Sequence, residues 1–392
     1  MRVVHARLLV AALWAAALAP ALAQAEPVKV GIAYDTSGPF AALGAEARAG
    51  FDLAIKQLGG KLGGQPTEFV QADMAGNPDQ ARQLATRFIQ RDKIDFFTGP
   101  IGSNVALAVG PALFAAKIPF LSNNPGPSQF AGAQCNPYWF GLSYQNDAFH
   151  EAAGKVAADH GYKKVYAIAP DYPAGRDALA GFKRGYKTPV AEEIYTKLGQ
   201  SDYAAELATL RAAKPDALYV FLPGAMGVNF IKQFVAAGLS SGIALVAPSF
   251  SADEDVIAAV GEPMLGIYNT AQWAADLDVP RNKAFVAAFR QEYGGRYPTV
   301  YAAQAYDVIM AIDAAVKQVG GKVSDRAAVV KALEKADFSS VRGPFAYGKN
   351  HYPIQAYYVR QVAKDDQGRL TNKLVGKVFD RYQDVYVGEC KM

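Results

Sequence analysis

Hydrophobic residues along this chain fall alternately into short continuous runs and into longer stretches with helical spacing. Short runs rich in β-branched and aromatic residues indicate buried strands, and apolar positions three or four apart indicate amphipathic helices. The first part of the chain accordingly predicts strands at 28–33, 68–71, 94–98 and 119–122, and helices at 42–58, from 78 onward and at 104–116. Asn77 and Pro78 are suited to cap and begin the second of these helices. Short connections between alternating strands and helices predict a doubly wound, parallel α/β sheet.

The same alternation restarts near residue 145 and predicts a second α/β unit. Its expected strands are 164–169, 190–195, 217–221 and 243–246, and its expected helices are 147–160, 175–187, 202–213, 226–237 and 253–260. Beyond them the pattern predicts a long helical stretch at 282–319, a helix at 324–336 and antiparallel strands from 352. No low-complexity linker separates the two units, so we expect the chain to cross between them more than once.

The N-terminus has the pattern of an export signal. Arg2 and Arg7 precede an apolar stretch that ends at a small-x-small site, Ala23-Gln24-Ala25. An N-terminal membrane anchor is the alternative, but Pro20 interrupts the apolar stretch, which is shorter than the roughly 20 residues a spanning helix needs. We therefore predict a signal peptide over residues 1–25, cleaved near Ala25, and a mature protein outside the cytoplasm.

The charge balance argues against a nucleic-acid partner. The leader contains two of the 40 Lys and Arg residues and none of the 36 Asp and Glu residues, which leaves a mature net charge of +2. The basic residues are scattered, and they do not form the run that a nucleic-acid groove or a membrane patch requires.

Two cysteines, Cys135 and Cys390, occur in the whole chain. In an oxidising compartment an isolated pair favours one disulfide, which would tie the C-terminal tail to the middle of the chain, although two free thiols remain the alternative. Two cysteines and four scattered histidines are too few to predict a metal site.

Motifs for catalysis and for phosphate binding are missing from the expected positions. The turn after the first strand, residues 34–39, lacks the glycine triplet of a dinucleotide site. Residues 238–242 match a hydrolase elbow in letters, but they follow a helix and precede a strand, so the glycines are expected to cap the helix. His150, His160 and His351 have no evident nucleophile partner, and structural or surface roles are expected for them. The sequence therefore predicts no enzyme and no cofactor.

A glycine-rich loop at residues 98–104 joins a predicted strand to a predicted helix, with Ser103 at the helix start. Exposed backbone amides and the positive end of a helix dipole suit such a place to a carboxylate. Ser103 would equally serve as a cap of its own helix, and one serine can do both.

Several segments together resemble the substrate-binding proteins of branched-chain amino acid ABC transporters, the Leu/Ile/Val-binding type. They are 30–44, 77–81, 99–106, 118–122, 301–313 and 342–345. The resemblance covers essentially the whole mature chain. It implies a type I periplasmic binding protein fold, with two doubly wound Rossmann-like lobes joined by three hinge crossings, near 141–144, 270–273 and 345–349. The lobes would comprise residues 26–143 plus 273–346 and residues 144–272 plus 347–392.

The resemblance also implies which residues hold the ligand. Ser103 matches the family serine that binds the ligand carboxylate, and residues 123–128 match a second ligand-binding loop. Residues 171–175 and 221–224 match contact loops of the opposing lobe, although Tyr172 is equally well interpreted as a surface residue. The expected ligand contacts are Ser103, Asn104, Asn124, Gly126, Tyr172, Phe221, Ser249 and Phe250.

One departure from the amino-acid binders bears on the cargo. Those proteins place an acidic residue after the strand at 243–246 to pair with the α-ammonium, and this chain has Ser249 there. A buried ammonium without its partner costs about 3–5 kcal/mol. If the alignment slips, Asp253 or Glu254 would serve instead. Segments 123–127, 135–140, 145–147 and 387–390 also resemble the aromatic-acid-binding branch of the family.

We therefore expect a monomeric periplasmic protein that captures a small carboxylate, such as a benzoate or a hydroxycinnamate. It would deliver this ligand to an ABC permease in the inner membrane, without a metal, a cofactor or a nucleic-acid partner. A branched-chain or other aliphatic amino acid is the alternative cargo. An exported hydrolase and a ligand-sensing partner of a membrane receptor are the alternatives from other classes.

Overall fold

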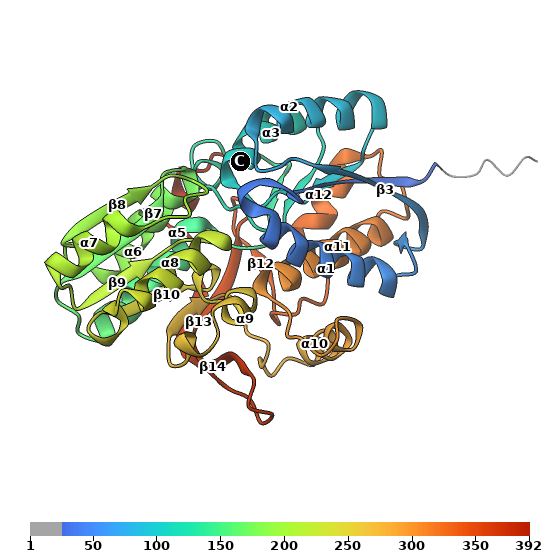
Figure 1. Ribbon diagram of the computed structural model, residues 1–392. Coiled ribbons are helices and arrows are strands. Elements are labelled where there is room, and N and C mark those ends of the chain that lie inside the picture. The colour runs from blue at the N-terminus through green and yellow to red at the C-terminus, as the bar shows by residue number, and fades with distance from the viewer. Residues whose placement is uncertain (1–25) are drawn as a thin grey trace, which may run out of the picture.

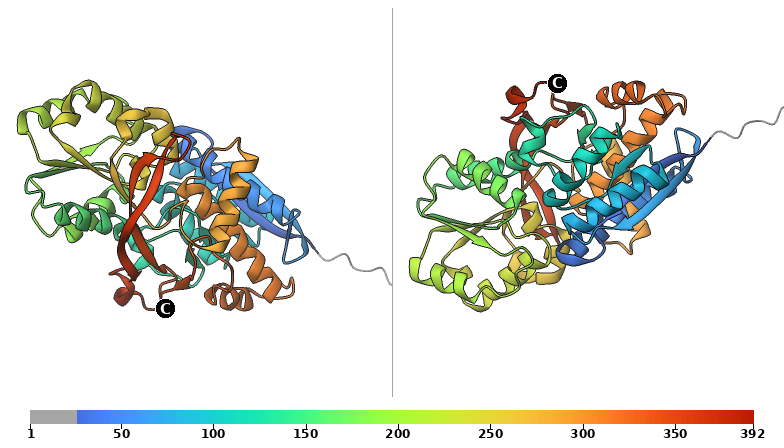
Figure 2. Two further views of the ribbon diagram at one scale, coloured as in Figure 1. Left: turned by 90° about the horizontal axis from the view of Figure 1, so that it is seen from below. Right: turned by 90° about the horizontal axis from the view of Figure 1, so that it is seen from above.

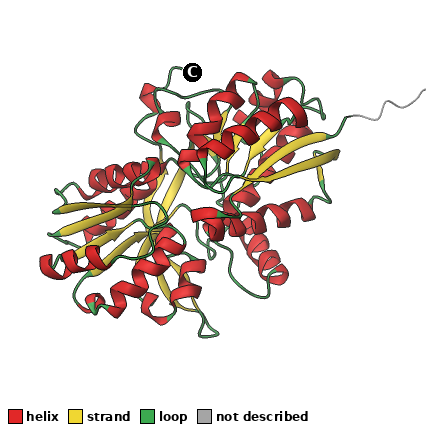
Figure 3. Ribbon diagram, turned by 45° about the horizontal axis from the view of Figure 1, so that its top comes forward, coloured by secondary structure: helices red, strands yellow, loops and turns green. Residues whose placement is uncertain are grey.

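The alternating hydrophobic runs form two separate sheets, each with helices on both faces, in the computed structural model, which describes residues 26–392 (Figures 1 and 3). The predicted signal peptide, residues 1–25, lies outside the described residues. Within the described part the first sheet has six strands, in the order β2 (Lys61–Leu62), β3 (Gln65–Asp73), β1 (Val28–Tyr34), β4 (Phe96–Thr98), β5 (Phe120–Ser122) and β6 (Trp139–Gly141). All neighbouring pairs are parallel except the β2–β3 hairpin.

Helices from both ends of the chain cover the first sheet. They are α1 (Ala41–Gln57), α2 (Pro78–Arg87), α3 (Ser103–Ala115), α4 (Ser128–Ala131), α10 (Pro280–Glu292), α11 (Val300–Gln318) and α12 (Arg326–Glu334). Val30 and Ile32 of β1 are buried in the cluster that includes α1 and α11, whereas Ala33 is buried with α2 and α3. The period-two alternation of β1 therefore fills both faces of the sheet.

The second sheet has eight strands in the part of the chain that the structure describes. Their order is β12 (Ala346–Tyr347), β13 (Pro353–Lys364), β11 (Tyr268–Ala271), β10 (Ala244–Pro248), β9 (Ala217–Val220), β7 (Val165–Pro170) and β8 (Glu192–Thr196), with β14 (Leu370–Tyr382) paired to β13. The strands β7 to β11 are parallel, and β13 is antiparallel to β11 and to β14.

The helices of the second sheet are α5 (Asn146–Asp159), α6 (Pro173–Tyr186), α7 (Ala204–Ala213), α8 (Ala225–Ala236) and α9 (Glu254–Val260). Short single turns of helix lie at Gly38–Phe40, Phe88–Asp92, Leu239–Ser241, Ser249–Ser251, Glu262–Met264 and Val387–Glu389. Figure 2 shows the long β13–β14 hairpin, in red, passing between the two lobes toward the C-terminus.

Between residues 26 and 392 the chain passes from one sheet to the other three times, after β6, after β11 and before β12. This confirms the predicted fold class of two doubly wound lobes with three crossings, whereas the exact lobe boundaries stay a prediction. The predicted disulfide is also confirmed: Cys135 and Cys390 are bonded at 2.08 Å and close a loop of 255 residues in sequence separation.

The predicted continuous helical stretch at 282–319 is wrong, because two helices, α10 and α11, occupy it. Gly294 and Gly295 separate them, with φ angles of 65° and 83° that an α-helix does not contain. Pro298 follows, and Thr299 caps α11 by accepting a hydrogen bond from the backbone of Ala302 at 3.2 Å. Glycine and proline chemistry therefore overrides the helical spacing of the apolar residues here.

Candidate ligand-binding site

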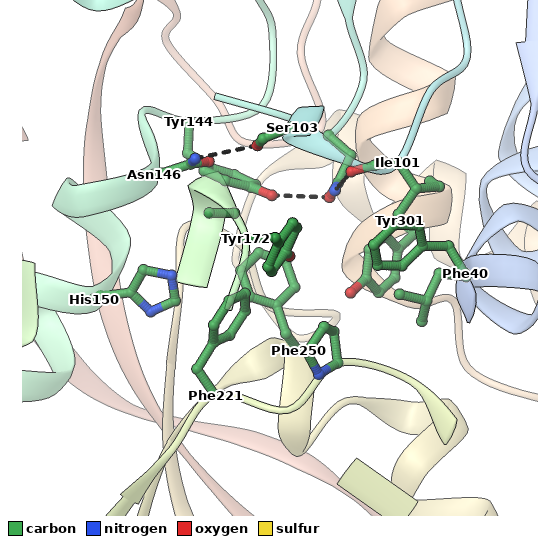
Figure 4. A pocket seen from close by; sticks show the side chains of 14 residues that line it. Phe40, Ile101, Ser103, Tyr144, Asn146, His150, Tyr172, Phe221, Phe250 and Tyr301 are labelled. Atoms are coloured by element: carbon green, nitrogen blue, oxygen red, sulfur yellow. Dashed lines mark hydrogen bonds between the residues drawn. The ribbon is translucent and has the colours of Figure 1, made fainter. Parts of the chain in front are cut away.

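A cavity lies between the two lobes, at the carboxyl ends of the strands in both sheets. The space between its lining atoms, with the open solvent at its mouth included, is about 330 Å³. Its lining residues are Phe40, Leu43, Ile101, Ser103, Asn124, Tyr144, Asn146, His150, Tyr172, Ala174, Phe221, Pro223, Phe250 and Tyr301 (Figure 4). This is where open α/β sheets generally bind small molecules.

The polar end of the cavity is built by the loop between β4 and α3. The buried carboxylate of Asp35 accepts hydrogen bonds from the backbone amides of Ile101 at 2.8 Å and Gly76 at 2.7 Å. These bonds fix the loop so that Ser103, which is 2 % exposed, becomes the first residue of α3. Ser103, the first residue of this 13-residue helix, therefore lines the cavity at the positive end of the helix dipole.

Asn124 adds a second polar group beside Ser103. Its Nδ2 donates to the Ile101 carbonyl at 2.8 Å, and its Oδ1 accepts from the Tyr144 hydroxyl at 2.9 Å (Figure 4). Asn124 follows β5 and Tyr144 follows β6, so the ends of adjacent strands bring the two together.

The other end of the cavity is a wall of aromatic rings from both lobes. Tyr172, Phe221 and Phe250 follow strands β7, β9 and β10, and the rings of Tyr172 and Phe221 are stacked at 6.4 Å with an angle of 12°. Across the cleft, Phe40 lies 6.0 Å from Tyr172, and Tyr301 lies 5.8 Å from Phe250. These contacts close the second lobe onto the first around a narrow space with flat, apolar sides.

The lining is electrically neutral. Among the described residues that line the cavity there is no Asp, Glu, Lys or Arg. Burial lowers the pKa of His150 to about 3, so its ring is uncharged at neutral pH, and its Nδ1 lies 2.5 Å from the Tyr219 hydroxyl. Burial also raises the pKa of the Tyr144, Tyr172 and Tyr301 hydroxyls, which therefore stay protonated.

Five of the eight predicted ligand contacts line the cavity: Ser103, Asn124, Tyr172, Phe221 and Phe250. The structure places the other three behind its wall. Asn104 points away and donates to the Gly76 carbonyl at 3.2 Å. Gly126 donates its backbone amide to Asn146 at 3.0 Å, and Ser249 is fully buried, with no hydrogen-bond partner for its hydroxyl within residues 26–392.

The two acidic residues considered as substitutes for Ser249 also lie elsewhere. Asp253 is fully buried, pairs with Arg360 at 3.2 Å and accepts from the Val300 amide at 2.7 Å. Glu254 accepts from the Thr371 hydroxyl at 3.0 Å, beside β14. Both carboxylates are therefore engaged in structural contacts outside the cavity lining.

Sequence reasoning missed several residues of the wall. Phe40 lies in the turn before α1, Tyr301 in the first turn of α11, and Tyr144 and Asn146 just after the first crossing. His150, for which a structural or surface role was expected, is also part of the lining. The position of Tyr144 and Asn146 beside a predicted hinge was a signal that could have pointed to them.

No helix in residues 26–392 is both long and apolar enough to cross a membrane. The described residues also contain no group of three or more His, Cys, Asp and Glu side chains placed to hold a metal ion.

Comparison with known proteins places this architecture in a family. The sequence matches the family model described as "Periplasmic binding protein" over residues 27–368. It is 31 % identical to the Leu/Ile/Val-binding protein homolog 6 of Brucella melitensis, over 94 % of this chain and 95 % of that protein.

Two solved structures extend the comparison. A solute-binding protein of an ABC transporter from R. palustris, in complex with benzoate, has a TM-score of 0.88 and 34 % identity, covering 93 % of this chain and all of that one. A solute-binding protein from Rhodopseudomonas palustris BisB5, in complex with 3,4-dihydroxybenzoic acid, has a TM-score of 0.84 and 33 % identity, covering 92 % and 99 %. The family match implies a periplasmic location and a binding protein that is not an enzyme. The chain therefore belongs to the periplasmic binding protein family.

Proposed function

We propose that this protein captures an aromatic carboxylate, of the benzoate or hydroxycinnamate type, between its lobes and delivers it to an ABC importer. The observation that carries the proposal is a flat, aromatic cavity whose lining, within the described residues, has hydrogen-bond donors at one end and no charged side chain.

The carboxylate would lie at the polar end of the cavity. Ser103 offers a hydroxyl, the start of α3 offers backbone amides and a positive helix dipole, and Asn124 offers an amide hydrogen. Hydrogen bonds from neutral donors to a charged acceptor contribute about 1.5–3 kcal/mol each. These values are already net of the hydration that donor and acceptor give up, so each such bond favours binding of the carboxylate.

The ring would lie between the aromatic walls. Tyr172 and Phe221 present nearly parallel faces, and Phe250 closes the end against Tyr301. Offset stacking and edge contacts add about 0.5–1.5 kcal/mol per aromatic pair beyond simple burial. Tyr301 directs its hydroxyl into the cavity (Figure 4), where a ring substituent of the ligand would meet it.

The neutral lining also supports an acid without an α-amine. An amino acid would bring an ammonium group into the cavity, and the two acidic residues nearest in sequence, Asp253 and Glu254, are engaged elsewhere. The two R. palustris proteins described above are in complex with benzoate and with 3,4-dihydroxybenzoic acid, which have a carboxylate and no amine.

Delivery follows from the two-lobed architecture. Ligand contacts come from both lobes, so binding stabilises the closed arrangement that a membrane permease would recognise. We also propose that residues 1–25 direct export and are removed near Ala25, and that the mature protein acts as a monomer with lobes formed by residues 26–143 plus 273–346 and 144–272 plus 347–392.

The second candidate cargo is a branched-chain amino acid, which the name of the Brucella relative favours. Isothermal titration of the purified, refolded protein separates the two candidates, with benzoate, 4-hydroxybenzoate and p-coumarate compared against leucine and valine. We expect heat of binding with at least one aromatic acid and none with the amino acids. Tight leucine binding without any response to the aromatic acids would overturn the proposal.

A further inference from the structure

Asn146 lies at the centre of a buried hydrogen-bond chain that ends at the candidate carboxylate site. Its Nδ2 donates to Ser103 Oγ at 3.2 Å and to Asp177 Oδ2 at 2.9 Å. Its Oδ1 accepts from the backbone amide of Gly126 at 3.0 Å. Asn146 is 2 % exposed, and both hydrogens of its amide group are used in these bonds.

Two partners of fixed polarity set the orientation of this amide. The backbone N–H of Gly126 can only donate, so it requires the oxygen of Asn146. An ionised carboxylate can only accept, so Asp177 requires the nitrogen. A flipped amide would place donor against donor and acceptor against acceptor, and the Nδ2 of Asn146 therefore always faces Ser103.

The loop of Gly126 is built for this contact. A Cβ on Gly126 would lie 2.1 Å from the carbonyl oxygen of Tyr144, so no other residue allows the loop to come this close. Gly126 thus contributes to the site through Asn146, although it does not line the cavity itself.

Asp177 holds the other side of the amide. It is 8 % exposed and accepts from the Ser128 hydroxyl at 2.7 Å and from the Ser128 backbone at 3.1 Å, as well as from Asn146. Burial and the charge of Asp147 raise the pKa of Asp177 to about 6, which leaves it mostly ionised at neutral pH. Three donors converging on one carboxyl group agree with the ionised form.

The fixed orientation of the Asn146 amide determines the direction of the Ser103 hydroxyl. Because its Oγ accepts from Asn146, the single hydrogen of the hydroxyl is left to point away from Asn146, toward the cavity that Ser103 lines. We propose that Asn146 is a positioning residue that makes Ser103 a dedicated hydrogen-bond donor, and that this polarity selects a carboxylate over a neutral amide of the same shape. The inference rests on the proposed capture of a carboxylate by Ser103.

The isosteric variant Asn146→Asp tests the proposal. Two adjacent carboxyl groups share one proton, so the net charge of the pair is the same as that of the native Asn146 and Asp177. The shared proton lies between the two acids, and the side chain at position 146 then presents only lone pairs to Ser103. Ser103 must donate to it and turns its own lone pairs toward the ligand.

Titrations with benzoate and with benzamide, its neutral amide, measure this polarity. We expect Asn146→Asp to lower the benzoate-to-benzamide affinity ratio about tenfold or more, with the benzamide affinity within about threefold of the native protein. Asn146→Ala, which removes the amide without adding an acid, is expected to lower the ratio several-fold and serves if Asn146→Asp does not fold. An unchanged ratio in the folded variants overturns the proposal.

A double-mutant cycle shows whether Asn146 acts through Ser103. In a Ser103→Ala background we expect Asn146→Asp to have little further effect on the ratio, whereas additive effects would mean direct contact with the ligand and would overturn the positioning role. Ser128→Ala is the matched control. It removes a different hydrogen bond between the lobes, from the Ser128 hydroxyl to Asp177, and leaves the side chains of Asn146 and Ser103 in place, so it should affect both ligands equally and leave the ratio unchanged.

The test of the proposed function can be told apart from the test of the role of Asn146. If the native protein binds leucine and no aromatic acid, the aromatic cargo is wrong. The same cycle, measured with leucine and leucinamide, then decides the role of Asn146.

Discussion

Asp177 should lower the stability of the folded protein at neutral pH. Burial, with a contribution from the like charge of Asp147, raises its pKa from an ordinary 3.8 to about 6. A raised carboxyl pKa means that the folded chain binds more protons than the unfolded chain between about pH 4 and pH 6, so stability falls as the pH rises through that window. A shift of about two units corresponds to at most about 3 kcal/mol.

The variant Asp177→Asn isolates this effect. An asparagine has the same shape, can accept from Asn146 with its oxygen, and carries no charge to desolvate. We expect the variant to match the native protein near pH 4 and to be more stable by up to about 3 kcal/mol above pH 6. Ligand-free thermal and urea unfolding, followed by circular dichroism at half-unit pH steps, measures the difference between the two proteins.

Asp73 provides a control, because its pKa shift should affect stability in the opposite direction. Burial is the largest single effect on the pKa of Asp73 and raises it, but the hydrogen bonds from Ser37, Ala75 and Thr36 together lower this pKa overall. Asp73→Asn should therefore be less stable than the native protein at pH values above about 4, and this difference should shrink as the pH falls below that value. If Asp177→Asn shows the same sign as Asp73→Asn, the three donors outweigh burial at Asp177 and the reasoning is wrong.

Three further predictions concern the ligand-binding site and the disulfide. Ser103→Ala should weaken carboxylate binding by about 1–3 kcal/mol in calorimetry, and an unchanged affinity would reduce Ser103 to the start of its helix. Tyr301→Phe should weaken 4-hydroxybenzoate about three- to tenfold and leave benzoate unchanged, because only the hydroxylated ring can pair with the Tyr301 hydroxyl; equal effects on both acids would refute this. Replacing Cys135 and Cys390 by serine should lower the unfolding free energy by about 2–5 kcal/mol at unchanged ligand affinity, and a parallel loss of affinity would contradict it.

The features that the sequence predicted correctly are those with local causes. Asn77 caps α2 as expected, with its Oδ1 accepting from Asp79 at 2.9 Å and Gln80 at 3.2 Å. The spacing of apolar residues predicted the strands and helices of the two sheets, because this spacing reflects burial within a single element. The disulfide followed from an isolated cysteine pair in an exported chain.

The features that were missed depend on packing between distant segments. Phe40 and Tyr301 are 261 positions apart in the chain, and only the folded lobes bring them to one wall. Ser249 and Phe250 show the same limit at short range. In a single turn of helix adjacent side chains point in different directions, so Phe250 faces the cavity and Ser249 is buried behind it. Loops have no periodicity from which such directions can be predicted.

The preference between an aromatic acid and an amino acid depends on the cost of burying one ammonium group in the cavity. In a cavity whose described lining has no carboxylate, an ammonium has no ionic partner and could contact only neutral oxygens or the faces of rings such as Tyr172 and Phe221. A cation–π contact contributes about 0.5–2 kcal/mol, whereas a buried ammonium without its ionic partner costs about 3–5 kcal/mol. The deficit of about 1–4.5 kcal/mol corresponds to an affinity roughly 5- to 2,000-fold weaker than that of an acid with the same contacts and no amine. The aromatic wall therefore offsets only part of the cost of burying an ammonium without an ionic partner. The cavity favours an aromatic acid that has no ammonium group.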